Sequence, residues 1–219
     1  MLLIAIVGSG IMAQRLCGGN VGLALLANAI ATGGALIALI LAFGPVSGAH
    51  FNPVVTLADA SRGGLSWRHV PAFVSAQFGG AIAGVAVANL MFALPAFSAS
   101  AHVRDGTGLF ASEIVATFGL LAVVWGVGKS RPGAAPYAVA AYIVGAYWFT
   151  PSTSFANPAV TLARSLTDTF AGIRSNDVLP FMLAQLIGAL SATALFAWLA
   201  PAAHVSTDLL RDDVGKIMP

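Results

Sequence analysis

Two asparagine–proline pairs are the residues of this sequence whose types and spacing best suit chemistry on a small ligand. The first stretch contains Asn52-Pro53-Val54, and the second contains Asn157-Pro158-Ala159, 105 residues further on. An asparagine amide accepts hydrogen bonds through its oxygen and donates them through its nitrogen. One such pair alone would indicate a helix N-cap. Two matching copies indicate a duplicated architecture.

The composition is that of a membrane protein. The 219 residues are 58% hydrophobic and only 8% charged, whereas soluble domains average about 25% charged residues. The ten basic residues are scattered and the net charge is +2, so we expect no nucleic-acid partner. The single Cys17 forms no internal disulfide, and no Cys/His cluster has metal-ligand spacing, so we expect no metal and no cofactor.

The elements that must position the asparagines are six long apolar segments and two short ones. The long segments run approximately over 1–16, 20–43, 68–92, 109–129, 135–150 and 178–200, and the short ones over 53–61 and 158–166. A nine-residue helix is only ~14 Å long, about half of the hydrocarbon thickness. The short segments are therefore expected to be half-helices. The first long segment reaches only ~22 Å, so either it tilts into thinned lipid or Met1 is not the natural start.

Proline explains how each half-helix begins. Pro53 and Pro158 would occupy the first helical turn, where the missing N–H is not needed. The irregular approach over 43–51 exposes backbone polar groups, which are tolerated at membrane depth only beside protein or a water-filled cavity. We therefore expect both asparagines beside a pore.

The chain is predicted to be a single transmembrane domain over 1–219, with halves at about 1–92 and 109–200 and a tail over 201–219. Each half has two spans, a re-entrant helix and a third span, and the odd number of crossings inverts the second half. One side of this topology would carry six basic residues, namely Arg62, Arg68, Lys129, Arg131, Arg211 and Lys216. The other would carry four, namely Arg15, Arg104, Arg164 and Arg174. This bias favours cytoplasmic termini.

The sequence resembles the aquaporin and aquaglyceroporin (major intrinsic protein) family over nearly its whole length. Ser47-Gly48-Ala49-His50-Phe51-Asn52-Pro53-Val54 is similar to the first family signature, with Val54 in place of the usual alanine, and Asn157-Pro158-Ala159 matches the second. The resemblance implies an all-α membrane protein with six transmembrane helices and two re-entrant half-helices, assembled as a homotetramer in a plasma or bacterial inner membrane. The half-helix N-termini would repel cations, and both asparagines would donate N–H bonds to passing oxygens.

The resemblance also indicates an atypical selectivity filter. The arginine that usually follows the second asparagine by three residues is replaced by Val160. By the spacing of the family, the other filter positions are Thr32, Ser154 and either Gly145 or Ala146. A filter of such residues would be wider and less cationic than that of a strict water channel. Alternatively, Val160 packs and another basic group restores the filter.

Four titratable residues are candidates for a vestibule or scaffold: His50, Asp59, Glu113 and Arg164. Arg164 lies one turn beyond Val160, and Asp59 is its counterpart in the first half; both could line vestibules or extend to the interface. The resemblance implies that Glu113 accepts bonds from a loop backbone, with proton transfer as the alternative. His50 could line the inner pore wall, and pH gating there would need further titrating partners.

The predicted function is a passive channel for water and small uncharged solutes such as glycerol, urea or neutral metalloid hydroxides such as arsenite. A proton- or ion-coupled secondary transporter is the alternative, because inverted repeats and broken helices also occur there. An intramembrane enzyme is not expected, because the sequence holds no nucleophile, base and metal constellation.

Overall fold

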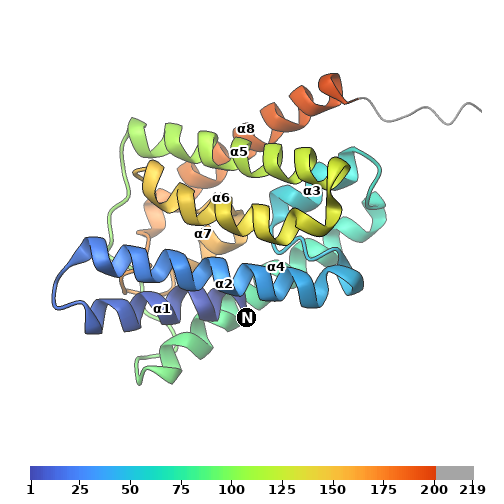
Figure 1. The fold of residues 1–219 in the computed structure, drawn as a ribbon. Helices are drawn as coiled ribbons and strands as arrows, with labels where there is room; N and C mark the ends of the chain where they lie inside the picture. The colour runs from blue at the N-terminus through green and yellow to red at the C-terminus, as the bar shows by residue number, and fades with distance from the viewer. Residues whose placement is uncertain (201–219) are drawn as a thin grey trace, which may run out of the picture.

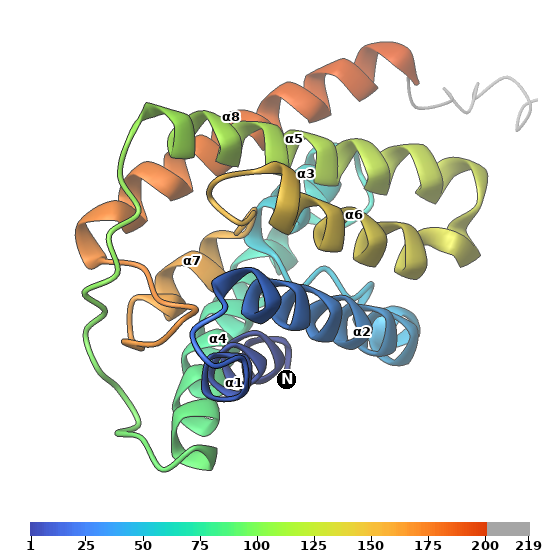
Figure 2. The ribbon, with the colours of Figure 1, turned by 60° about the vertical axis from the view of Figure 1, so that its left-hand side comes forward.

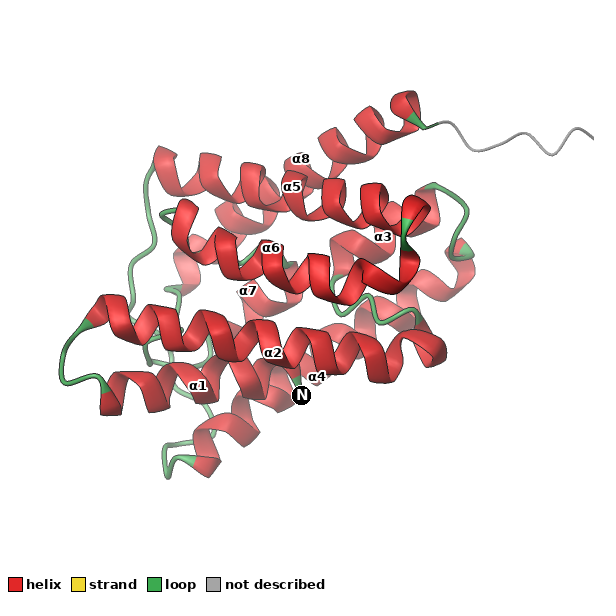
Figure 3. Ribbon diagram, in the orientation of Figure 1, coloured by secondary structure: helices red, strands yellow, loops and turns green. Residues whose placement is uncertain are grey.

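The computed structural model describes residues 1–200, apart from the side chain of Lys129, and every regular element among them is a helix (Figure 3). The α-helices are α1 (Leu2–Leu16), α2 (Val21–Ser47), α3 (Pro53–Ser61), α4 (Val70–Met91), α5 (Thr107–Ser130), α6 (Ala135–Phe149), α7 (Pro158–Arg164) and α8 (Ser175–Leu199). Short 3-10 turns precede α4 and α6. The predicted tail 201–219 lies outside the described residues.

The helices follow the apolar segments closely, with one correction. The second segment was expected to end at residue 43, but α2 continues through Pro45 to Ser47 and the irregular approach is confined to 48–52. A proline in the last turn removes only one backbone donor. The helix ends instead at Gly48, whose φ of 74° is the left-handed conformation typical of a glycine C-cap.

Within residues 1–200, four helices are long and apolar enough to cross a membrane: α2, α4 with its preceding 3-10 turn, α5 and α8. Helices α1 and α6 have 15 residues each, which gives them a length of about 22 Å. They are apolar but shorter than the hydrocarbon core of about 30 Å.

The two short helices lie inside a bundle of longer ones (Figure 1). Helix α3 contacts α4 and α8, and α7 contacts the same two helices and α1. The long helices pack as α1 with α2 and α4, α2 with α6, and α5 with α6 and α8. This arrangement brings α3 and α7 together at the centre, where they also contact each other.

The connection between α4 and α5, residues 92–106, is an extended strip that runs past the segment following α7 (Figure 2). Backbone bonds attach it there: Ser98 and Ser100 donate to the carbonyls of Leu166 and Ser165 at 3.0 and 3.1 Å. This strip therefore closes one end of the bundle and brings its side chains beside α7.

Candidate functional site

The N-termini of α3 and α7 meet at the centre of the bundle through crossed hydrogen bonds. The Nδ2 of Asn52 donates to the carbonyl of Ala156 at 2.7 Å, and the Nδ2 of Asn157 donates to the carbonyl of Phe51 at 2.8 Å. Each amide thus binds the loop that precedes the other half-helix. The two copies of the repeat are therefore joined directly to each other by hydrogen bonds.

The same asparagines also cap their own helices. The Oδ1 of Asn52 accepts from the backbone N–H of Val54 at 3.1 Å, and the Oδ1 of Asn157 accepts from those of Ala159 and Val160 at 3.0 and 3.2 Å. Capping and a pore role are therefore compatible, because they use different atoms of the amide. Pro53 and Pro158 occupy the first turn of α3 and α7.

The loops before the two half-helices have the same unusual backbone. Ala49 and Phe51 have φ of 48° and 49°, and the residues 105 positions later, Ser154 and Ala156, have φ of 49° and 47°. Non-glycine residues rarely adopt this left-handed conformation, and its recurrence at a functional site is a sign of constraint. Both loops are held so that the carbonyls of Phe51 and Ala156 face the opposite asparagine.

A cavity of about 250 Å³ passes both asparagines and extends from Asp59 at one end to Arg164 at the other. Its walls are helical stripes with a spacing of four residues, the spacing that places side chains on one face. Helix α2 contributes Thr32, Leu36 and Ile40, and α6 contributes Ala135, Val139, Ile143 and Tyr147. The cavity is mostly apolar, with polar groups at its centre and ends.

Three of the predicted filter residues border this cavity: Thr32, Ser154 and Val160. Neither Gly145 nor Ala146 does; Ala146 is completely buried between helices. The wall residue of α6 is Tyr147, because it continues the four-residue stripe and the two predicted positions lie off it. The prediction from family spacing missed Tyr147, because the sequence alone does not show which face of α6 borders the cavity.

Tyr147 changes the character of this part of the cavity. Its ring is 3% exposed, and its hydroxyl lies 3.3 Å from that of Thr32, so α2 and α6 are joined across the wall. The hydroxyl of Ser154 has no hydrogen-bond partner among residues 1–200. Val160 borders the cavity and also packs against the apolar core of α1 and α4.

Glu113 of α5 is fully buried and holds the second loop. Its Oε1 accepts from the backbone N–H of Phe155 at 2.9 Å, and its Oε2 accepts from that of Ala156 at 2.8 Å and from the Nε2 of Gln185 at 2.7 Å. The Nε2 of Gln185 also donates to Thr161 at 2.8 Å. With three donors on its two oxygens, this carboxylate is suited to a scaffold role.

The first loop has no such carboxylate among the described residues. His50 and Phe51 correspond to Phe155 and Ala156, yet no hydrogen bond from their backbone N–H groups is found within residues 1–200. Gln77, the counterpart of Gln185, donates to Thr56 at 2.8 Å. A second cavity of about 490 Å³ lies here, bordered by the start of α1 and by α2 and α4. The two halves thus differ in how the loop before the half-helix is held: a buried carboxylate binds the second loop but not the first.

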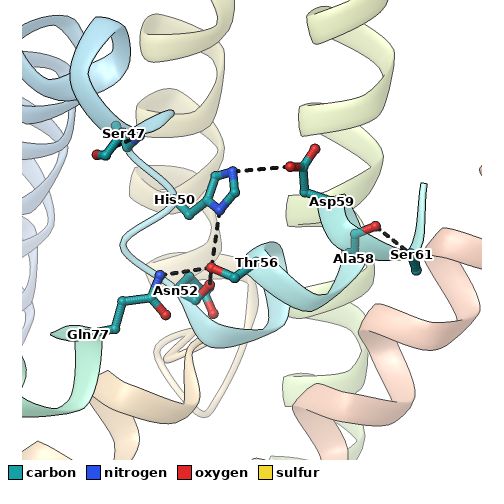
Figure 4. A network of polar contacts seen from close by, with 9 residues as sticks. Ser47, His50, Asn52, Thr56, Ala58, Asp59, Ser61 and Gln77 are labelled. Carbon is teal, nitrogen blue, oxygen red and sulfur yellow. Dashed lines mark hydrogen bonds and ion pairs between the residues drawn. The ribbon is translucent and has the colours of Figure 1, made fainter. Parts of the chain in front are cut away.

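A polar network forms the end of the channel cavity near α3 (Figure 4). The Nδ1 of His50 lies 3.1 Å from the Oγ1 of Thr56, and its Nε2 lies 3.6 Å from the Oδ2 of Asp59. Gln77 donates to the same Thr56 hydroxyl. Both His50 and Asp59 border the cavity.

Two buried arginines form the opposite end. The Cζ of Arg164 lies 3.4 Å from the ring centroid of Phe155, and the Cζ of Arg104 lies 4.9 Å from it. Arg164 is 3% exposed and borders the cavity. Arg104 donates to the carbonyls of Gly172 and Ser152 at 2.8 and 3.2 Å. Sequence reasoning missed Arg104 and Phe155, because only the fold brings the 92–106 strip to α7.

Burial dominates the electrostatics of this end. It lowers the pKa of Arg104 to about 10, although Glu113 and Tyr147 act to raise it, so the guanidinium is charged at neutral pH. Burial, followed by the charges of Arg104 and Arg164, lowers the pKa of His102 below 6.5. His102 is therefore neutral at pH 7. Among residues 1–200, no group of three His, Cys, Asp or Glu side chains could hold a metal ion.

Comparisons with known proteins agree with this geometry. The model of the family described as "MIP: Major intrinsic protein" matches residues 1–152. "Aquaglyceroporin AqpS" of Rhizobium meliloti (strain 1021) is 52% identical over 199 residues, which cover 91% of this chain and 85% of the relative. The chain belongs to the major intrinsic protein family. It is therefore a multi-pass membrane channel and not an enzyme.

One further relative and one solved structure are also similar to this chain. The "Glycerol uptake facilitator protein" of Streptococcus pneumoniae (strain ATCC BAA-255 / R6) is 32% identical over 125 residues, covering 51% of this chain and 53% of the relative. The chain thus spans about half the length of that protein. The X-ray structure of the aquaglyceroporin from Plasmodium falciparum matches with a TM-score of 0.66 and 21% identity, covering 96% of this chain and 94% of that one. This match shows that the two proteins share a fold.

Proposed function

We propose that this chain is a passive channel for water and small uncharged solutes, of the aquaglyceroporin kind. Glycerol, urea and neutral metalloid hydroxides such as arsenite are the candidate solutes. The observation that carries this proposal is the cavity that runs past both asparagines, from Asp59 to Arg164. Each asparagine has one N–H bonded to the opposite loop, so its second amide hydrogen remains for a passing oxygen.

The filter in this proposal consists of Thr32, Tyr147, Ser154 and Val160, which border the cavity beyond the asparagines. Valine offers no hydrogen-bond donor, whereas the usual guanidinium offers a fork of five N–H groups and a fixed charge. The valine side chain is also shorter than that of arginine. We expect larger neutral solutes to pass more readily than in a strict water channel.

The proposed architecture has six crossing helices and two re-entrant half-helices, α3 and α7, in inverted halves at about 1–92 and 109–200. Both termini would be cytoplasmic, in the cell membrane, and four copies would form a homotetramer with one pore each. Support for this orientation comes from the basic residues of the sequence, six on the side of the termini and four on the side of Arg104 and Arg164. On this basis, the arginine end faces outward.

Stopped-flow light scattering on reconstituted vesicles tests the function. Vesicles with the protein should shrink faster than empty vesicles under a sucrose gradient, and should re-swell faster in glycerol, urea and arsenite. Water flux without any solute flux would contradict the aquaglyceroporin assignment. Flux that saturates at low solute concentration and follows a proton gradient would instead support a coupled transporter.

The surroundings of Glu113 are unsuited to a coupled transporter, which would have to use Asp59. Such a transporter needs a carboxylate that can exchange protons or ions during each cycle. Glu113 is fully buried and bonded to three donors, and Asp59 is 27% exposed and lies beside His50. Only Asp59 borders the channel cavity.

A further inference from the structure

The cavity wall has a guanidinium, although not at the position where the family usually has one. Arg164 lies four residues after Val160 on α7, which places it on a similar face and about one turn, or ~5.4 Å, further along the axis. Both residues border the same cavity. The charge missing at Val160 is thus present one turn nearer the proposed outer mouth.

Contacts from two sides fix this guanidinium in place. Its Nε donates to the carbonyl of Ala171, and its plane lies over the ring of Phe155, with Cζ 3.4 Å from the centroid. The ring of Phe155 is itself held by Phe181, whose centroid is 5.3 Å away at an interplanar angle of 73°. A stacked arginine is pre-organised, so little entropy is lost when it binds a solute.

The positive charge of Arg164 has no counter-ion in contact. The salt bridges among residues 1–200 join His50 with Asp59, and Arg174 with Asp105 and Asp177, and none involves Arg164. The bond from Nε to Ala171 is also the only side-chain hydrogen bond of Arg164 within those residues. The two terminal nitrogens therefore remain free to donate toward the cavity that the residue borders.

We propose that Arg164 is the cation-excluding and solute-orienting residue of this channel, in place of the absent arginine at position 160. The guanidinium repels cations at the outer mouth, where few waters screen it, and its free N–H groups bind the oxygens of neutral solutes. The narrow part between Thr32 and Val160 is then free of charge. This proposal rests on the proposed channel function.

The test compares Arg164→Gln with wild type in vesicles that report solute and cation flux together. A stopped-flow swelling assay follows glycerol, and a vesicle-trapped pH dye follows protons driven by a potassium diffusion potential. In Arg164→Gln we expect the proton leak above empty vesicles to rise about tenfold or more, because a fixed charge near the path is removed. Arg164→Lys retains the charge and should leak much less.

Two further variants separate charge from folding. Arg68→Gln removes one positive charge from an exposed site outside the channel cavity and should not raise the leak. Phe155→Leu retains Arg164 but removes the ring beneath it, and should give an intermediate leak. Gel filtration in detergent checks that each variant is folded, and the uncharged Arg164→Met replaces Arg164→Gln if the latter aggregates.

The outcomes are distinguishable. Glycerol flux in wild type, with the same low proton leak in Arg164→Gln or in its uncharged replacement Arg164→Met as in wild type, would overturn the role of Arg164 and leave the channel function intact. An equal leak in Arg68→Gln and Arg164→Gln would also overturn it. Wild-type protein that carries no neutral solute at all would overturn both the proposed function and this inference.

Discussion

Val160 borders the channel cavity and packs against α1 and α4 at the same time. An arginine at this position would have to leave the core and extend its guanidinium into the cavity, because a buried unpaired charge is costly. It would narrow the passage beside Thr32 and Tyr147. The identity of one residue therefore bears on both the packing and the permeability of the channel.

Val160→Arg should reduce glycerol permeability by about tenfold, equivalent to ~1.4 kcal/mol in the barrier, and water permeability by less. The reason is steric: glycerol fills more of the passage than water does. Stopped-flow swelling and shrinking on the same vesicles measure both. Val160→Ala is the control that widens the passage. An equal reduction of both permeabilities, or none, would mean that residue 160 is not in the filter.

His102 gives the arginine end a pH dependence. Its pKa is lowered by burial and then by the charges of Arg104 and Arg164, with Asp168 opposing the shift. The unfolded chain therefore binds this proton first as the pH falls through 6.5, and the folded state loses stability. The melting temperature of wild type should fall further between pH 7.5 and pH 5 than that of His102→Gln. Equal decreases in the melting temperatures of the two proteins, measured by tryptophan fluorescence, would show that His102 does not cause the pH dependence.

At the scale of elements, the positions of the helices along the chain were predictable. The side chains that each helix presents to the cavity were not. Hydropathy and the repeated proline located the eight α-helices of residues 1–200, because lipid requires long apolar segments and proline marks each short helix. Tyr147 and Phe155 were missed as wall and stacking residues. Their roles depend on the rotation of α6 and on the strip at Arg104, which are set by contacts between distant segments.

Glu113 shows how α5, α8 and the second loop depend on one side chain. Glu113→Gln replaces one acceptor oxygen by an NH2 group that faces N–H donors, and buried bonds to a charged acceptor are worth about 1.5–3 kcal/mol each. The variant should therefore unfold at a clearly lower temperature in detergent. Ser191→Ala, at an exposed hydroxyl of α8 that bonds only its own helix, is the matched control. An unchanged melting temperature would contradict the scaffold role.

For the whole molecule, the channel cavity is enclosed by helices of a single chain. Its walls come from α1, α2, α5, α6 and the two half-helices. A tetramer would consequently hold four separate pores, with lipid-facing apolar side chains around them. This is why the single chain can be treated as the unit of permeation.

Mixed assemblies test that independence. Wild type and Val160→Arg are co-expressed in known ratios and reconstituted, and native mass spectrometry counts the subunits. Glycerol flux should fall nearly in proportion to the wild-type fraction, because Val160→Arg narrows only the pore of its own subunit. A steeper fall, with flux lost once a single variant subunit is present, would indicate a passage shared between subunits.

The crossed bonds of Asn52 and Asn157 have a consequence for speed. Each amide nitrogen has already given one hydrogen to the opposite loop, so a solute oxygen receives at most one from each asparagine. Conduction requires binding that is strong enough to admit a molecule and weak enough to release it. A pair of half-occupied donors meets that requirement, because it can guide each oxygen without capturing it. We therefore expect the interlocking of the two halves to limit residence time, so that rapid throughput would follow from the same bonds that hold the duplicated loops together.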